Sequence, residues 1–254
     1  EYLDFHNGFG VMCVGHANPV IAAAVKAQMD LGTHFAAPTE GSITVAAELK
    51  RRWGLPHWRF TNSGTESTMD AIHLARAASG EDVIIKIEGT YHGHHDAVMV
   101  SVKPPAELMG DRAHPASVAY GLGYPEAMVE LTRVVPFNDA DALERLLDEL
   151  EGKVAGVILE PAMMNVNIVP PVAGYLERVR ELTSAHGVTL IFDEVKTGAA
   201  VAAGGATELY GVTPDVVCLA KAICGGLPGG AIGVTDELAT LMADGRVRQQ
   251  GTFN

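Results

Sequence analysis

The sequence has few cysteines, few basic residues and no long apolar segment, and each shortage disfavours a class of protein. Three cysteines among 254 residues are an odd number and form no C-x-x-C pair, which disfavours a disulfide framework and is typical of reduced cytoplasmic proteins. Basic residues number 18 against 31 acidic ones, and the net charge of −13 disfavours nucleic acid or an acidic membrane as partner. No uninterrupted apolar run of about 18 residues occurs and no export signal is present, so we expect a cytoplasmic protein that does not span a membrane.

Apolar residues are plentiful, at 48% of the chain, and they gather in short continuous segments between amphipathic ones. Continuously apolar strands indicate a sheet covered on both faces, and their alternation with helices predicts mostly parallel pairing. We therefore predict one α/β domain over residues 1–254, with a mostly parallel seven-stranded sheet between two helical layers. The predicted strands are 82–87, 97–102, 133–137, 154–159, 188–193, 216–220 and 230–234. The predicted helices are 19–30, 42–53, 65–79, 139–151, 173–186 and 235–244.

Charged residues follow or end three of the predicted strands, namely Glu160, Asp193 and Lys221. Ligands of open α/β sheets bind at the carboxyl ends of the strands, so we expect these side chains to meet in one crevice. A lysine taken alone is more often a solvated surface residue. A lysine before a glycine-rich turn, with an aspartate at a strand end, nevertheless suits pyridoxal phosphate (PLP). The amine can form a Schiff base with the cofactor aldehyde, and the carboxylate can keep the pyridine nitrogen protonated.

Small and hydroxyl-bearing residues stand just before the predicted helix 65–79, in the segment FTNSGTES. Such residues leave backbone N–H groups free and let an anion approach closely, as a phosphate group requires. The residues concerned are Ser63, Gly64 and Thr65. On this segment alone, an ordinary helix cap is an equally good interpretation.

Two loop segments after predicted strands hold further candidates. In GTYHGHHDAV, Tyr91 could stack on a flat ring. The three histidines of this segment lie in a short turn without a distant partner motif, so we predict no metal site. In LEPAMMNVNIVPP, Asn165 could cap a loop or donate a hydrogen bond to a cofactor oxygen, because a buried amide needs partners.

These motifs in this order resemble the class III aminotransferases, a PLP-dependent family of fold type I. The segments NSGTES, YHGHHD, LIFDEVKTG and GVTPDVVCLAKAICGGLPGGAIG carry the resemblance, together with the final GTFN. It covers almost the whole chain, and it is strongest to glutamate-1-semialdehyde 2,1-aminomutase-like members. The resemblance implies a PLP-binding large domain over residues 1–254 that transfers the amino group of a small amino acid or amine.

The resemblance also implies a role for each residue around the cofactor ring. Lys221 would form the Schiff base and move the proton, and Asp193 would pair with the pyridine nitrogen. Tyr91 would stack on one face of the ring with His92 beside it, and Val195 would pack against the other face.

The remaining implied roles concern the edges of the cofactor. Asn165 would lie near the ring oxygen, and Glu160 would order that side of the site. The phosphate group would be held by Ser63, Gly64 and Thr65. Thr252 would reach the phosphate group of a partner subunit, which implies a homodimer with shared active sites.

Departures from the aminomutase pattern leave the reaction open. Phe9, Met164 and Ala200 stand where many of these relatives have tryptophan, glycine and arginine. An aminomutase and a donor-dependent transaminase acting on a β-amino acid, an ω-amino acid or an amine are therefore both possible. A non-catalytic binding protein with the same fold is a third interpretation. A nucleotide-dependent dehydrogenase is disfavoured, because no G-x-G-x-x-G opens a helix after the first strand.

Overall fold

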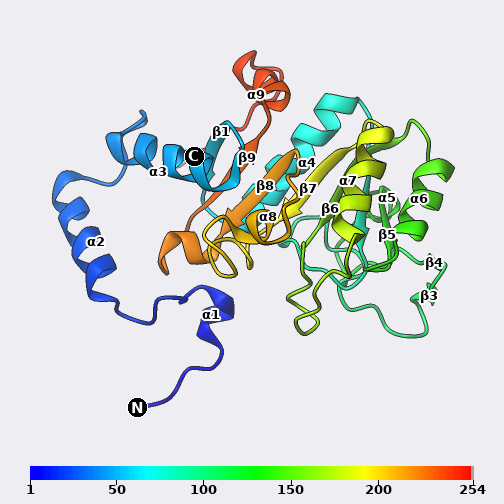
Figure 1. The fold of residues 1–254 in the computed structure, drawn as a ribbon, viewed down its shortest axis with the longest axis horizontal. Coiled ribbons are helices and arrows are strands. Elements are labelled where there is room, and N and C mark those ends of the chain that lie inside the picture. Colours follow the sequence, from blue (N-terminus) through cyan, green and yellow to red (C-terminus); the bar gives the residue numbers. More distant parts are fainter. Residues whose placement is uncertain (253–254) are drawn as a thin grey trace.

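A seven-stranded sheet forms the centre of the molecule in the computed structural model, which describes residues 1–252 (Figure 1). Its strand order is β1-β9-β8-β7-β6-β2-β5, and β9 runs antiparallel to both of its neighbours while the other pairs are parallel. The strands are β1 (His57–Thr61), β2 (Val83–Ile87), β5 (Thr132–Val135), β6 (Val154–Leu159), β7 (Thr189–Asp193), β8 (Val216–Ala220) and β9 (Gly230–Val234). A two-stranded hairpin of β3 (Gly110–Asp111) and β4 (His114–Pro115) lies outside this sheet.

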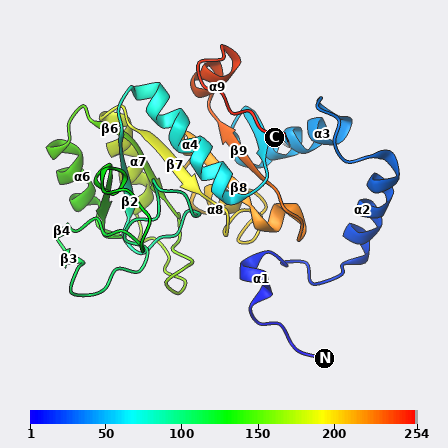
Figure 2. The same ribbon diagram turned by 180° about the vertical axis from the view of Figure 1, so that it is seen from behind.

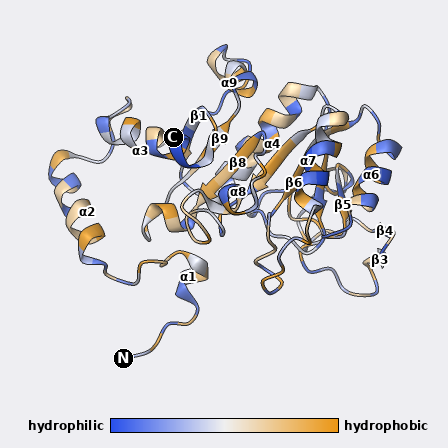
Figure 3. Cartoon of the chain, in the orientation of Figure 1, coloured by the Kyte–Doolittle hydropathy of each residue, from blue (hydrophilic) through white to orange (hydrophobic). Residues whose placement is uncertain are grey.

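Helices cover both faces of the sheet, as the sequence predicts. The helices α3 (Glu40–Trp53), α6 (Ala140–Glu149) and α7 (Tyr175–Ala185) pack on one face, and α4 (Gly64–Ser79) and α9 (Asp236–Ala243) pack on the other. Figure 1 is seen from the side of α7, and the view from behind in Figure 2 brings α4 to the front. Apolar residues gather in the strands while polar ones mark the outward faces of α6 and α7 (Figure 3). The three-layer αβα class is confirmed.

The predicted helices are confirmed to within two residues at each end, because their start and stop signals act locally. The Asn18 side chain accepts hydrogen bonds from the first N–H groups of α2 (Pro19–Leu31), and Asp139 does the same for α6. Gly80 ends α4 in the left-handed conformation, at φ +76°. The sequence missed four shorter helices, because so few residues show no period: α1 (Asn7–Gly10), α5 (Glu126–Glu130), α8 (Gly205–Tyr210) and the 3₁₀-helix η1 (Lys221–Cys224).

One predicted strand is wrong, and a different segment supplies the seventh strand. Residues 97–102 form a single bridge, between Val100 and Ala119, and their buried side chains pack as a covering segment. A short apolar run does not distinguish a strand from other buried chain. The strand that the sequence missed is β1, an edge strand that pairs only with β9 and is mostly half-exposed, so it lacks a continuous apolar run.

The N-terminal region extends from the body of the domain as an arm (Figures 1 and 2). Its helix α2 has no buried residue, and several large apolar side chains before it are exposed, including Tyr2, Leu3 and Phe5. Within residues 1–252, the structure contains no helix with both the length and the apolar character needed to cross a membrane.

Glu194 is a buried carboxylate that joins α3, α8 and the loop after β7. It has no exposed surface, and it accepts hydrogen bonds from Trp53 Nε1 at 3.1 Å, from Thr197 Oγ1 at 3.0 Å and from the backbone N–H groups of Ala206 and Thr207. Burial raises the pKa of this carboxyl group, and the donors around it oppose that rise. The side chain therefore holds together the segment that follows Asp193.

Replacing Glu194 with alanine is expected to lower the free energy of unfolding by about 3 kcal/mol or more, because several buried donors lose their acceptor at once. Urea unfolding of the wild type and the variant would measure the change. The control is Glu181→Ala, which removes an exposed carboxylate on α7 that pairs with Arg178, and there we expect at most about 0.5 kcal/mol. A loss at Glu194 as small as the control's would contradict the role assigned to this carboxylate.

Candidate functional site

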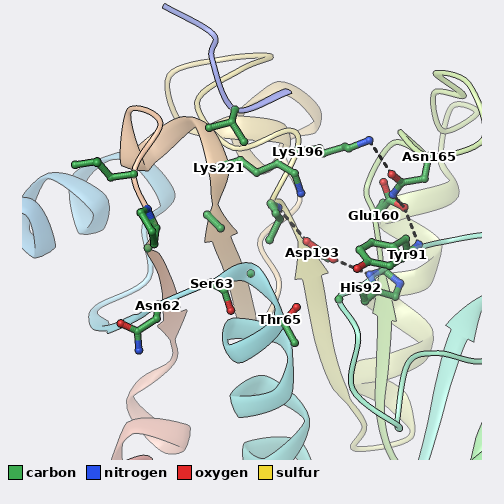
Figure 4. Close-up of a pocket in the computed structure, with 18 residues that line it drawn as sticks. Asn62, Ser63, Thr65, Tyr91, His92, Glu160, Asn165, Asp193, Lys196 and Lys221 are labelled. Atoms are coloured by element: carbon green, nitrogen blue, oxygen red, sulfur yellow. Dashed lines mark hydrogen bonds and ion pairs between the residues drawn. The ribbon is translucent and has the colours of Figure 1, made fainter. Parts of the chain in front are cut away.

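A cavity of about 350 Å³ opens at the C-terminal ends of β6, β7 and β8 (Figure 4). It also receives the loop between β1 and α4 and the loop after β2. The cavity brings together nearly all of the residues singled out in the sequence: Ser63, Gly64, Thr65, Tyr91, His92, Glu160, Asn165, Asp193, Val195 and Lys221. Thr252 does not line the cavity and is exposed. Glu160, Asp193 and Lys221 line this one cavity, so the structure places them together as the sequence predicted.

Asp193 and His92 form a buried pair on the floor of this cavity. Asp193 Oδ2 lies 2.7 Å from His92 Nδ1, and the backbone N–H of Val195 donates to Asp193 Oδ1 at 2.9 Å. Only 5% of Asp193 and 1% of His92 is exposed. Because both carboxylate oxygens have partners, the aspartate is held in one orientation with little access to bulk water.

Lys221 enters the cavity from the junction of β8 and η1. Its backbone has φ +47°, a left-handed conformation that strains any residue with a side chain and persists only where the surroundings impose it. Figure 4 shows its amine directed into the cavity on the side of Asp193. Burial lowers the pKa of Lys221, the Asp193 carboxylate opposes this, and the nearby Lys196 ammonium adds to the lowering. A larger share of the amine is therefore neutral, the form that acts as nucleophile and base.

Glu160 organises the opposite wall of the cavity. Only 3% of it is exposed, and it accepts hydrogen bonds from Asn165 Nδ2 at 3.0 Å, from the N–H of Met164 at 2.9 Å and from the N–H of Tyr91 at 3.4 Å. Asn165 Oδ1 in turn accepts a hydrogen bond from Lys196 Nζ at 2.7 Å. An anion on one side and a cation on the other fix the orientation of the amide. Burial raises the pKa of Glu160, and His92 opposes that rise.

The N-terminus of α4 faces the cavity and suits an anion. Ser63 is the N-cap residue, and its side chain accepts from the N–H of Glu66 at 3.2 Å, so the ordinary capping role is present. A Cβ at Gly64 would lie 2.9 Å from a methyl group of Val195, so the close approach of α4 to the loop after β7 requires glycine. The first N–H groups of a helix have no partner within the helix, and its dipole favours negative charge there. A phosphate group fits this position.

The histidines of the YHGHHD segment separate in the structure. His92 belongs to the buried pair, His94 Nδ1 lies 3.1 Å from Thr65 Oγ1, and His95 Nε2 lies 3.2 Å from Thr68 Oγ1. Burial lowers the pKa of His95 to about 4, so its ring is neutral. Among the residues that the structure describes, no group of three His, Cys, Asp or Glu side chains could hold a metal ion. His92 Nε2 is buried and has no hydrogen-bond partner among residues 1–252. Because His92 lines the cavity, this nitrogen is available to a bound ligand.

Sequence reasoning missed two lysines of this region. Lys196 lines the cavity one residue after Val195, and a charged residue in the segment DEVKTG was the available signal. Lys86 is a fully buried residue of β2, and its Nζ donates to the carbonyl oxygens of Thr90 at 2.9 Å and Val100 at 2.6 Å. It thereby holds the residue just before Tyr91. A lysine inside an apolar strand could have signalled this role.

Lys86 makes the stability of the fold depend on pH. Burial lowers its pKa to about 7, whereas in the unfolded chain the amine keeps its proton up to about pH 10. Between these values the unfolded state binds more protons, so the free energy of unfolding rises with pH. From pH 7 to pH 9 we expect the wild type to gain about 2 kcal/mol relative to Lys86→Met. Urea unfolding of both proteins at pH 7, 8 and 9 measures this difference, and parallel pH profiles would contradict it.

The fold and the cavity define an α/β protein with a lysine and a buried aspartate–histidine pair at the C-terminal ends of its parallel strands. The family model for class III aminotransferases matches residues 1–254, and the chain belongs to this family. The fold type I architecture expected from the motifs is thereby confirmed.

Curated relatives and solved structures agree with the family. The glutamate-1-semialdehyde 2,1-aminomutases of Methanococcus maripaludis (strain C5) and Methanocaldococcus jannaschii are 43% identical over 256 residues and 44% identical over 255 residues, and each match covers 100% of this chain. The chain spans only 58% of the length of either relative.

Among solved structures, an omega-transaminase from Sphaerobacter thermophilus superposes with a TM-score of 0.94 at 39% identity, covering 99% of this chain and 58% of that one. A glutamate-1-semialdehyde aminomutase from Pseudomonas aeruginosa PAO1 superposes with a TM-score of 0.85 at 36% identity, covering 98% of this chain and 54% of that one. Both an aminomutase and a transaminase therefore share the fold at more than 30% identity.

Proposed function

We propose that this chain is the PLP-binding domain of an enzyme that moves amino groups, of the glutamate-1-semialdehyde 2,1-aminomutase type. The observation that carries the proposal is the Lys221 amine facing the buried Asp193–His92 pair in one cavity. Two named aminomutases at 43% and 44% identity support the same reaction. When bound, PLP supplies an electron sink for the bonds at the substrate's amino-bearing carbon.

The residues of the cavity divide the work of such a site. Lys221 Nζ, whose pKa burial lowers, would move a proton between the substrate carbon and the cofactor. The Asp193 carboxylate, fixed by His92, would keep a proton on the cofactor's ring nitrogen. The N-terminus of α4 binds the phosphate group through Ser63, Gly64 and Thr65.

Further residues orient the ring. Tyr91, 37% exposed at the cavity wall, is the stacking partner for one face, and Val195 offers an apolar contact for the other. Asn165 is held between Glu160 and Lys196, and the second N–H of its amide would donate to the ring oxygen.

One experiment separates the two amino-transfer reactions. The full-length protein, with its cofactor in the amino form, receives glutamate-1-semialdehyde and no amino donor, and 5-aminolevulinate is followed over time. Many turnovers per site support the aminomutase, because it returns the amino group to the same carbon skeleton. At most one turnover supports a donor-dependent transaminase, the alternative that the Sphaerobacter thermophilus structure favours. The PLP-loaded form of the same protein tests the third interpretation: no cofactor absorbance, or absorbance that borohydride does not bleach, would instead indicate a binding protein.

A homodimer is part of this proposal. The arm of α1 and α2 exposes apolar side chains, with Tyr2 97% and Phe5 94% exposed, which a partner subunit would cover. Thr252, exposed and outside the cavity, is free to serve the partner's phosphate site. Light scattering of the full-length protein tests the assembly, and a monomer at micromolar concentration would refute it.

A cytoplasmic location is also part of the proposal. The free thiols of Cys13, Cys218 and Cys224 agree with it.

A further inference from the structure

Lys196 is a second cation in the wall of the cavity, and the hydrogen bond that orients Asn165 is the one task given to it so far. It lies just after Val195 and lines the same cavity as Lys221. Its Nζ donates to Asn165 Oδ1 at 2.7 Å and lies 3.4 Å from the carbonyl oxygen of Met164. Figure 4 shows the Lys196 amine at the rim beside Asn165, on the same wall as Glu160.

Both acceptors of Lys196 are neutral. Within residues 1–252 its ammonium forms no ion pair with a carboxylate, although the chain has far more acidic than basic residues. An ammonium has three N–H donors, and two neutral oxygens satisfy it less well than an anion does. The wall therefore offers a positive charge that the chain itself does not neutralise.

The other charges of the cavity already have partners. Asp193 is bound by His92 and the N–H of Val195, and Glu160 is bound by Asn165 and by backbone N–H groups. Lys221 is reserved for the chemistry proposed above. Among the described residues that line the cavity, Lys196 is consequently the cation left for an anionic part of the substrate.

We propose that the Lys196 ammonium binds the carboxylate of the substrate, so that this site takes amino acids in preference to simple amines. This inference rests on the proposed function and names its substrate class. A charge-assisted hydrogen bond from the ammonium to a carboxylate orients the substrate, with the amino group toward Lys221. The closeness of the two lysines supports this geometry, because the Lys196 charge contributes to the lowered pKa of Lys221.

A purely structural role is the competing explanation. In that case Lys196 only holds Asn165, and its loss would affect every substrate equally, because the orientation of the amide does not depend on which substrate is bound. The two roles therefore differ in substrate dependence, which a matched pair of substrates measures directly.

The test compares the full-length, PLP-loaded wild type with Lys196→Met and Lys196→Arg. Single-turnover reactions use two pairs that differ in a carboxylate: 3-aminobutanoate with 2-aminobutane, and 4-aminobutanoate with 1-aminobutane. For Lys196→Met we expect the second-order rate constant of the single turnover to fall about 30- to 100-fold more with the acids than with the amines, mostly through weaker binding, because loss of the hydrogen bond to Asn165 affects both alike. Lys196→Arg keeps the charge and should recover most of the loss. Lys153→Met, the same change before β6 at the opposite edge of the sheet, is the matched control.

A binding measurement makes the result independent of turnover. Calorimetric titration with butanoate, which has the carboxylate and no amine, should give a dissociation constant weakened by about the same factor in Lys196→Met. Equal losses with acids and amines, unchanged kinetics, or butanoate binding that does not depend on Lys196 would each overturn the proposal. If the wild type reacts with none of the four compounds, the glutamate-1-semialdehyde reaction described above still tests the proposed function, and the butanoate titration decides the role of Lys196.

Discussion

Lys221→Ala is expected to reduce turnover by about 10⁴-fold, because the variant loses both the nucleophilic amine and the group that moves the proton. The cavity that surrounds this side chain contains no other half-buried lysine facing Asp193; Lys196 points its amine to Asn165 instead. Steady-state turnover of the full-length protein measures the loss. The absorbance of the bound cofactor gives a second readout, since without Lys221 it should no longer be fixed to the protein by borohydride.

The variant should remain folded and able to bind the cofactor, because the α4 N-terminus and Asp193 are unchanged. Alanine at position 221 still has a Cβ, so the strain of the left-handed backbone conformation at φ +47° persists and stability should change little. Lys153→Ala, at an exposed position before β6, is the control for losing a lysine. Turnover of Lys221→Ala within tenfold of the wild type would refute the assignment of this residue.

Asp193→Asn is expected to lower turnover by about 10³-fold with the shape of the site preserved. The asparagine side chain has nearly the same size, so packing at a position only 5% exposed is retained. What is lost is the negative charge that faces Lys221 and accepts from His92 Nδ1 and the N–H of Val195. A neutral amide cannot hold a proton on the cofactor's ring nitrogen, so the electron sink is weakened.

Asp215→Asn is the matched control for this change. Asp215 also accepts from a backbone N–H, that of Leu190 at 2.8 Å, but it stands just before β8 at the opposite edge of the sheet. Its replacement should leave turnover within about twofold, because the structure gives it no contact with the cavity. If Asp193→Asn behaved like this control, the buried aspartate would be a structural residue only.

The sequence predicted the six longer helices and six of the seven strands of the central sheet well because their signals are local. Caps such as Asn18 and Asp139, stops such as Gly80 and short apolar runs act within a few residues of the element that they mark. The exceptions have a common cause. Residues 97–102 are as apolar as a strand but pack as a covering segment, and β1 is an edge strand without an apolar run. An apolar run shows that a segment is buried, but it does not show whether the segment pairs with a strand or which strand it pairs with.

The candidate site shows the same division. Lys221, Asp193 and Glu160 could be named from the sequence because each follows or ends a strand, and parallel strands carry their ends to one edge. Which side chains contact one another could not be named. The Asp193–His92 pair joins residues 101 positions apart, and the hydrogen bond from Lys196 to Asn165 joins residues 31 positions apart.

The sequence by itself therefore determined the α/β class, the family resemblance and the residues proposed for amino transfer. Local propensity, hydrophobic pattern and residue chemistry are properties of short segments, and these segments keep them in any fold. Only the tertiary structure decided that Lys86 is buried beneath the Tyr91 loop, that Glu194 points away from the cavity and that Lys196 points into it. Burial and partners depend on the packing of distant segments, so charged residues of similar type acquire different roles.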